Sequence, residues 1–219
     1  MLASTVLSLN ISAPKDGLIK IMIRFFTALC KKLLQNYSEE TEERIVKDAT
    51  GEFHYYSESC PHCGAVGRLS PYGSYSRWLI SHENGQLVAH HINLLRFICS
   101  SCNTTHALLP DIIIPYSSYS LRFKLKLLLS YFERTTTVEA VCLQFGIAVS
   151  TLYEWKKLLY LHKELFFGLL ISQQTPALAF LCTLLHCSTI STFLCGFFHK
   201  YAFSFLQGTT PLATRSNPP

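Results

Sequence analysis

The chain has 219 residues, of which 49% are apolar and 15% charged, and its formal net charge is +5. This length can accommodate one or two compact domains with a hydrophobic core. The nine cysteines are an odd number, and residues 1–11 are apolar but lack the basic segment of a cleavable signal peptide. The composition therefore argues against a secreted disulfide framework and predicts a cytoplasmic protein with reduced cysteines.

Positive charge is concentrated in one part of the sequence. Residues 60–164 contain ten Lys and Arg against six Asp and Glu, whereas residues 1–59 contain seven against eight. This mild basic excess is compatible with a polyanionic partner.

The first segment, residues 1–54, is predicted to contain one amphipathic helix and a linker. Apolar residues recur at helical spacing across residues 22–36, with basic residues between them. The acidic run at residues 39–43 is interpreted as a solvated helix end or linker, which is the usual meaning of such a run.

Two Cys-x-x-Cys pairs flank a stretch of 35 residues. Four thiolates form the closed tetrahedral site of structural Zn²⁺, and a two-residue spacer lets both sulfurs of a pair face the same ion. Gly64 follows the first pair and Asn103 follows the second, and both residue types tolerate the left-handed backbone with which the chain can turn away from the ion. The sequence predicts one structural Zn²⁺ with the ligands Cys60, Cys63, Cys99 and Cys102.

The residues between the two pairs are typical of β-strands. Strands are expected at 68–72, 75–80 and 87–98, which are rich in aromatic and branched residues. Asn84-Gly85 is expected to form the turn between the two longer strands, because this dipeptide is a strong hairpin signal. A hairpin carried between two metal-binding loops is the architecture of a zinc ribbon.

The segment after the second pair is expected to be extended. Residues 105–116 contain two prolines, which disfavour a helix, and are predicted to pack along the ribbon as a bridge. His62 and His106 lie near the cysteines in the sequence. They are interpreted as non-ligands, because four cysteines already complete a tetrahedron.

Three helices are expected between residues 120 and 165. Ser120 is predicted to cap the first, a capping box over residues 136–139 to open the second, and Ser150 to cap the third. Gly146 supplies the turn between the second and third helices, and Cys142 is interpreted as a core residue. A short helix, a glycine turn and a second helix are the components of a helix-turn-helix.

The third of these helices is the candidate DNA-recognition helix. Its apolar side includes Leu152 and Trp155, and the polar residues early in the helix lie off that side. Such side chains can contact phosphates or base edges in the major groove. The alternative is that they are only polar residues on an exposed helix. The DNA-contact candidates are Ser150, Thr151, Tyr153, Glu154 and Lys157.

Residues 165–199 contain no charged residue, and the stretch 177–198 is long enough to span a bilayer. Polar residues interrupt it, Pro176 is well placed to begin a helix, and the apolar residues between Phe193 and Tyr201 recur at helical spacing. Two helices packed on the core or on a partner subunit are therefore preferred to a membrane segment. Residues 207–219 form a polar tail that is expected to be disordered.

Taken together, these motifs resemble a bacterial family of uncharacterised, transposase-related proteins that pair a zinc ribbon with a helix-turn-helix. The similarity covers about residues 55–165 and implies DNA binding connected with mobile elements. The segments that carry it are residues 60–64, 72–78, 99–102 and 105–111, together with Pro115-Tyr116 and Tyr119-Ser120.

Catalysis is not expected from this sequence. A two-metal nuclease core of the RNase H type needs three carboxylates spread over a mixed α/β domain of about a hundred residues or more. No Asp or Glu follows Glu164. The chain therefore resembles only the DNA-reading part of a transposase and is predicted not to be an enzyme.

The predicted fold class is α+β. The favoured function is zinc-dependent DNA binding, with Arg68, Arg77 and Arg96 as further phosphate contacts. One alternative is an interaction module, in which the ribbon and the C-terminal helices dock a protein partner or a second copy of the chain. The other is a membrane-tethered protein. The predicted regions are the helix and linker at 1–54, the ribbon and bridge at 55–118, the helix-turn-helix at 119–165, the apolar helices at 166–206 and the tail at 207–219.

Overall fold

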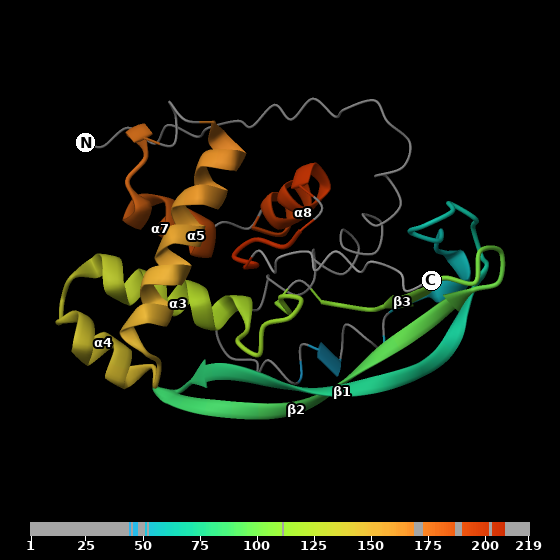
Figure 1. The fold of residues 1–219 in the computed structure, drawn as a ribbon, viewed down its shortest axis with the longest axis horizontal. Helices are drawn as coiled ribbons and strands as arrows, with labels where there is room; N and C mark the ends of the chain where they lie inside the picture. Colours follow the sequence, from blue (N-terminus) through green and yellow to red (C-terminus); the bar gives the residue numbers. More distant parts are fainter. Residues whose placement is uncertain are drawn as a thin grey trace, which may run out of the picture.

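The computed structural model describes residues 44, 46–47, 51, 53–110, 112–168, 173–186, 190–201 and 203–208. The predicted helix at 22–36, the acidic run at 39–43 and residues 209–219 of the predicted tail lie outside the described residues. The described part is a mixed α/β fold with a three-stranded antiparallel sheet and several helices. Figure 1 shows the sheet along one side and the helices gathered toward one end.

A long hairpin runs along the molecule (Figure 1). It consists of β1 (Leu69–Glu83) and β2 (Gln86–Cys99), which pair antiparallel. Asn84 and Gly85 have φ angles of 49° and 80° and form the predicted turn. The strands have 15 and 14 residues, so the hairpin is roughly 45 Å long at about 3.3 Å per residue.

β1 contains both of the strands predicted at 68–72 and 75–80. Its register shifts between Pro71 and Gly73, where the chain accommodates one extra residue and continues to pair with β2. The two predicted strands were therefore wrongly separated, because a β-bulge bends a strand without ending its ladder.

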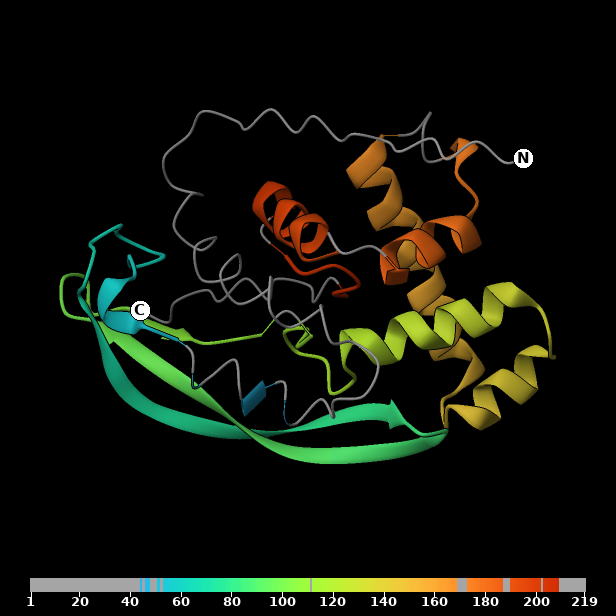
Figure 2. The same ribbon diagram turned by 180° about the vertical axis from the view of Figure 1, so that it is seen from behind.

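The third strand is short and belongs to the predicted bridge. β3 (Thr105–Ala107) pairs antiparallel with β2, with His106 opposite Phe97. The chain then crosses the concave face of the hairpin toward the helices (Figures 1 and 2). At the other edge of the sheet, Tyr119 pairs with Ile80 of β1 in an isolated parallel β-pairing. The segment is a strand at β3 and is non-helical over its other described residues, as expected, but Ile112, Pro115 and Tyr116 lie in turns.

Six helical elements have bounds within the described residues. A single 3₁₀ turn precedes the first cysteine pair, and the α-helices follow the sheet. The bounds are η1 (Tyr55–Ser57), α3 (Leu121–Glu133), α4 (Val138–Gln144), α5 (Val149–Phe167), α7 (Ala177–His186) and α8 (Ile190–Tyr201).

The helix starts confirm one predicted cap and correct two. The Ser120 hydroxyl accepts a hydrogen bond from the Phe123 amide at 3.0 Å, as predicted for α3. The prediction of a capping box at 136–139 is wrong. Thr137 is the N-cap of α4, and the residue three positions later is an alanine, which cannot complete the box. Ser150 does not cap α5, since Ala148 already has the extended N-cap conformation and the helix begins one residue later.

Three clusters of buried apolar residues follow one another along the hairpin. The helical cluster includes Phe123, Leu152 and Phe197, and Cys142 belongs to it as predicted. The middle cluster lies under the bridge and is formed by Val46, Leu79, Ile92, Leu94, Ile112 and Ile113. The cluster at the cysteine end is formed by Phe53, Cys60, Leu69, Phe97, Cys99 and Leu108.

The stretch 177–198 forms parts of two helices, α7 and α8, in agreement with the two helices predicted there. Their buried side chains, including Phe180, Leu184 and Phe193, pack into the helical cluster of this same chain. Within the described ranges, no helix is long and apolar enough to cross a membrane.

The tip of the hairpin packs against the turn between α4 and α5. The His82 ring stacks on Phe145 with 4.4 Å between ring centroids. The Lys126 ammonium donates to the His82 carbonyl at 2.9 Å. A Cβ atom on Gly146 would lie only 2.4 Å from Cδ1 of Leu87, so the turn approaches the strand closely. The hairpin therefore connects the cysteine end of the molecule to the helical end.

Candidate metal centre and the exposed face of helix α5

The two Cys-x-x-Cys loops meet at the end of the hairpin. The four Sγ atoms of Cys60, Cys63, Cys99 and Cys102 all lie within 4.8 Å of one another. The Cys60–Cys102 and Cys63–Cys99 sulfur distances are both 3.7 Å, and none of the four forms a disulfide. Four sulfurs at about 2.3 Å from a central Zn²⁺ would be about 3.8 Å apart in a regular tetrahedron. These four cysteines could therefore hold one metal ion.

The two loops have the same backbone hydrogen bonds. The Gly64 amide donates to the Cys60 carbonyl at 2.9 Å, and the Asn103 amide donates to the Cys99 carbonyl at 2.8 Å. Gly64 and Asn103 have φ angles of 76° and 54°, which confirms the left-handed turn predicted after each pair. In each loop the amide of the first cysteine also donates to the carbonyl five residues later, at 2.9 and 3.1 Å. The cysteines are thus presented by two matched loops.

The four thiols differ in their surroundings. Cys60 and Cys99 are fully buried, whereas Cys63 is exposed. Burial raises the pKa of Cys60 to about 12, and hydrogen bonds from Thr104 lower the pKa of Cys102 to about 5. A bound cation deprotonates the thiols that coordinate it. A cation bound among these sulfurs would therefore favour the ionised form of the buried Cys60 thiol.

His106 lies next to the cysteine cluster. Its Nε2 atom is 3.4 Å from Sγ of Cys60, and the backbone amide of His62 is also 3.4 Å from that sulfur. In the described part of the chain, the group of side chains able to hold a metal consists of the four cysteines without either histidine. β3 thus places His106 as a hydrogen-bond partner of Cys60, a position from which a side chain could orient a cysteine that binds a metal.

The polar residues at the start of α5 share one exposed face. Leu152, Trp155 and Leu159 are buried on the opposite side. At 100° per residue, the five predicted DNA-contact residues fall within roughly 160° of the helix circumference. Thr151 is half-buried and the other four are exposed: Ser150, Tyr153, Glu154 and Lys157.

Lys156 connects α5 to α3 and is not part of this polar face. Its ammonium donates to the Tyr131 hydroxyl at 2.8 Å and lies 5.0 Å from the centre of that ring. The hydrogen bond that Lys156 donates to Tyr131 is the main reason that the pKa of Lys156 is raised. This contact fixes the start of α5 against the end of α3.

Two polar clusters were missed in the sequence. The Ser81 hydroxyl lies 3.1 Å from Nε2 of His90, and both contact the Glu83 carboxylate, at 2.7 and 2.8 Å. His162 is fully buried, and its Nδ1 accepts a hydrogen bond from the Leu206 amide at 2.9 Å. The alternation of side-chain directions along β1 and β2 could have indicated that Ser81, Glu83 and His90 share one face of the hairpin. No residue near His162 in the sequence indicated its distant partner Leu206.

The three arginines expected to contact phosphate lie in different surroundings. Arg68 is exposed beside the cysteine loops. Arg77 and Arg96 are half-buried and line a pocket on the face of the sheet that the bridge crosses.

Residues 60–155 match a family described as a domain of unknown function (DUF6431). No curated protein and no solved structure matches the chain. The matched segment begins at the first cysteine of the candidate metal centre and ends within α5. It therefore contains the candidate metal centre together with most of the exposed α5 face.

Proposed function

We propose that this chain is a zinc-dependent, transposase-like DNA-binding protein. In this proposal the four cysteines of the metal centre hold one structural Zn²⁺ and close the base of a zinc ribbon. The helices α4 and α5, with the turn between them, act as a helix-turn-helix. The observation that supports DNA binding most strongly is the single polar face at the start of α5, opposite its buried side.

Zinc fits the donor set better than the other common divalent ions. Thiolates favour soft or borderline metals, and a closed set of four cysteines is typical of structural zinc. Four protein ligands leave no open position for a reacting water, so the ion would stabilise the fold and not catalyse a reaction. The matched backbone geometry of the two loops agrees with such a structural role.

DNA contact through α5 follows from its place after α4. The turn consists of residues 145–148, and Gly146 takes a left-handed φ of 58° there. Its amide donates to the Leu143 carbonyl at 3.2 Å, and the next amide donates to the Cys142 carbonyl at 3.0 Å, which ends α4 sharply. A helix presented in this way can enter the major groove with its first two turns. Glu154 could then accept from cytosine N4, and Lys157 could contact phosphate or guanine.

Metal analysis tests the first part of the proposal. Freshly purified, reduced full-length protein is expected to contain about one zinc per chain, as four-cysteine sites do. Protein free of zinc, or protein that retains zinc when Cys99 is replaced by serine, would reject this assignment.

DNA selection tests the second part. The full-length protein is incubated with a random duplex pool at several salt concentrations, and the bound sequences are recovered. We expect an enriched sequence and an affinity that falls log-linearly with salt. Lys157→Ala is expected to weaken binding and to lower the salt slope by about 1 if the ammonium contacts a phosphate. The matched control is Lys200→Ala, which removes an exposed lysine from α8 and is expected to change neither value. Absence of binding, or equal effects of both variants, would reject DNA recognition by α5.

A further inference from the structure

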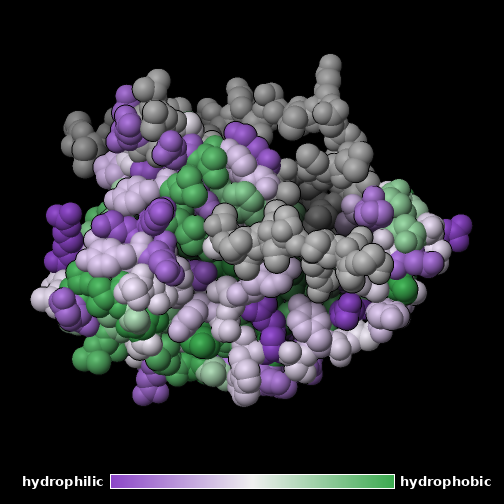
Figure 3. All heavy atoms as spheres, in the orientation of Figure 1, coloured by the Kyte–Doolittle hydropathy of each residue, from purple (hydrophilic) through white to green (hydrophobic). Residues whose placement is uncertain are grey.

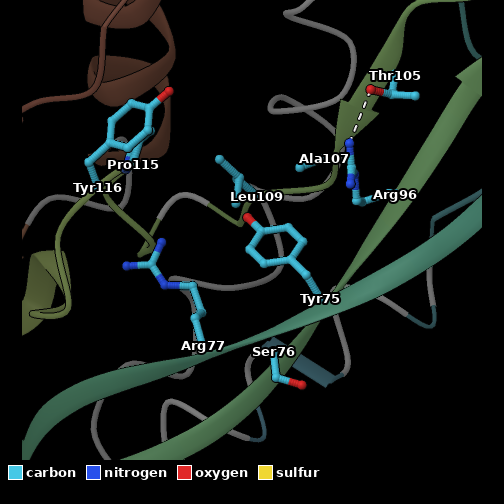
Figure 4. Close-up of a pocket in the computed structure, with 9 residues that line it drawn as sticks. All are labelled: Tyr75, Ser76, Arg77, Arg96, Thr105, Ala107, Leu109, Pro115 and Tyr116. Carbon is cyan, nitrogen blue, oxygen red and sulfur yellow. Dashed lines mark hydrogen bonds between the residues drawn. The ribbon is translucent and has the colours of Figure 1, made fainter.

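A pocket of about 620 Å³ lies between the sheet and the bridge. Figure 4 shows Tyr75 and Arg77 rising from β1, Arg96 from β2, and Leu109 and Tyr116 from the bridge. Ser76 also borders the pocket, but its side chain points away and donates to Asn93 at 2.5 Å. Figure 3 shows hydrophilic side chains reaching the surface over the middle of the sheet on this side. The α5 residues proposed to read duplex DNA do not line this pocket.

Two arginines make the pocket cationic. One Arg77 amino group donates to the Ser117 carbonyl, and one Arg96 amino group donates to the Thr105 hydroxyl at 3.2 Å. Arg96 also lies 5.9 Å from the centre of the Tyr72 ring. These contacts hold each guanidinium in place but use few of its five N–H donors. None of the nine described residues that line the pocket is acidic, so an anion could supply the missing partner.

The two guanidiniums flank an aromatic ring. Arg96 pairs with Gly73 across the hairpin, which places it two positions beyond Tyr75 on the face that also carries Arg77. Their backbone positions are therefore roughly 13 Å apart along the strand. In Figure 4 the two guanidiniums point to different sides of the Tyr75 ring. A ligand that touches both would need charge at two places and a flat or apolar part between them.

Tyr116 adds a second aromatic group at the edge of the pocket. Tyr116 is 87% exposed, and its backbone has a left-handed φ of 61°. A bulky residue in this left-handed region is strained, whereas glycine or asparagine would adopt the same backbone with less strain. Burial in the fold does not explain a tyrosine here, because the ring contributes little to the core. Strained residues of this kind concentrate at ligand sites.

We propose that this pocket binds nucleotide units, with Arg77 and Arg96 contacting phosphates and Tyr75 and Tyr116 contacting a base. Single-strand binders combine cationic grooves with aromatic side chains on which bases stack. The volume lies within the range of small-molecule sites, which suits one or two nucleotides rather than a duplex. The phosphate and base could belong to a single strand or to a free nucleotide, and the chemistry of recognition is the same.

The test measures binding of a labelled oligothymidylate of about ten nucleotides, a length typical of single-strand binders. Fluorescence anisotropy of the full-length protein is followed at several salt concentrations. Tyr116→Ala is expected to lower the affinity about 5-fold or more. Arg77→Gln and Arg96→Gln are each expected to lower the affinity and to reduce the salt slope by about 0.7. Because the arginines also contact the backbone or a neighbouring side chain, the exposed Tyr116 provides the variant least able to disturb folding.

Matched controls separate this pocket from the rest of the surface. Tyr56→Ala removes a tyrosine that is 65% exposed outside the pocket, and Lys200→Gln removes an exposed charge. Both are expected to leave oligothymidylate binding unchanged. Lys157→Ala is expected to affect duplex binding alone, so failure of the α5 proposal and failure of the pocket proposal give different results.

Competition experiments decide the source and class of the ligand. If unlabelled thymidine monophosphate competes as well per nucleotide as the strand does, the ligand is a free nucleotide. If only the strand competes, the ligand is a single-stranded nucleic acid. Equal competition by polyglutamate would show that charge alone is recognised and would overturn the proposal. The absence of oligothymidylate and nucleotide binding, or binding that survives all three pocket variants, would overturn it as well.

Discussion

Replacement of Gly146 by alanine tests whether the tip of the hairpin is packed on the turn between α4 and α5. The new methyl group would meet Cδ1 of Leu87 at 2.4 Å, and the backbone φ of 58° is unfavourable for alanine. The conformational cost is about 1–2 kcal/mol. Leu87 is 46% exposed and can rotate away, which would lose about half of the roughly 2 kcal/mol that a buried leucine contributes. The sum is a destabilisation of about 2–3 kcal/mol.

A double-mutant cycle separates these two costs. The free energy of unfolding is measured by urea denaturation for the wild type, Gly146→Ala, Leu87→Ala and the double variant. In the Leu87→Ala background the methyl group meets no side chain, so only the conformational cost remains and the two substitutions couple by about 1 kcal/mol. Gly146→Asn provides a further comparison, because asparagine tolerates the left-handed backbone but still carries a Cβ atom.

The result that would refute this reasoning is additivity. If the two substitutions add without coupling, the strand and the turn are not in contact in solution. If Gly146→Ala is also neutral, the left-handed turn after α4 is not formed. Either outcome would remove the physical connection between the hairpin and the helices.

Three further predictions concern the two ends of the fold and the bridge. Chelation of the metal is expected to increase amide exchange in the part of the hairpin next to the cysteines. The helical circular dichroism signal should persist, because the helical cluster lies at the other end. Simultaneous loss of amide protection and of the helical signal would contradict this expectation. Burial lowers the pKa of His162 from 6.5 to about 4, so the unfolded chain takes up a proton at a higher pH than the folded one. The free energy of unfolding should therefore fall by at most about 3 kcal/mol between pH 6.5 and 4, and His162→Gln should flatten this slope in urea titrations relative to the wild type. Tyr116→Asn should raise the free energy of unfolding by about 0.5–1 kcal/mol, because asparagine accepts the left-handed backbone; a loss of stability would show that the ring supports the fold.

The features that the sequence predicted well depend on short-range chemistry. The turn at Asn84-Gly85 and the matched positions of Gly64 and Asn103 follow from backbone preferences of single residues. The gathering of the cysteines follows from two local loops joined by one hairpin. In each case a few neighbouring residues specify the geometry, so one sequence is sufficient to predict it.

The features that were missed depend on long-range packing or on shifts of one residue. The bulge after Pro71 keeps β1 continuous where turn-forming residues suggested a break. Both misplaced caps lie one or two residues from the actual cap, because several Ser, Thr and extended residues compete for that position. The pocket was not predicted as a site, because Tyr116 reaches it only when the bridge folds back across the sheet.

The three apolar clusters suggest how the metal centre and the helices influence each other over the length of the hairpin. The cysteine-end cluster is too small to be stable alone, since it is built on few side chains and includes two of the proposed ligands. The helical cluster has many more buried residues and needs no metal ligand. The metal would therefore determine whether one end of the hairpin is ordered, while Gly146 and Leu87 determine how the other end is attached. Between them lies the pocket, where the curvature of the same two strands brings Arg77 and Arg96 to either side of Tyr75. Metal loss should accordingly weaken oligothymidylate binding more than it weakens the helical fold, because Arg96 lies three residues from Cys99 in the sequence.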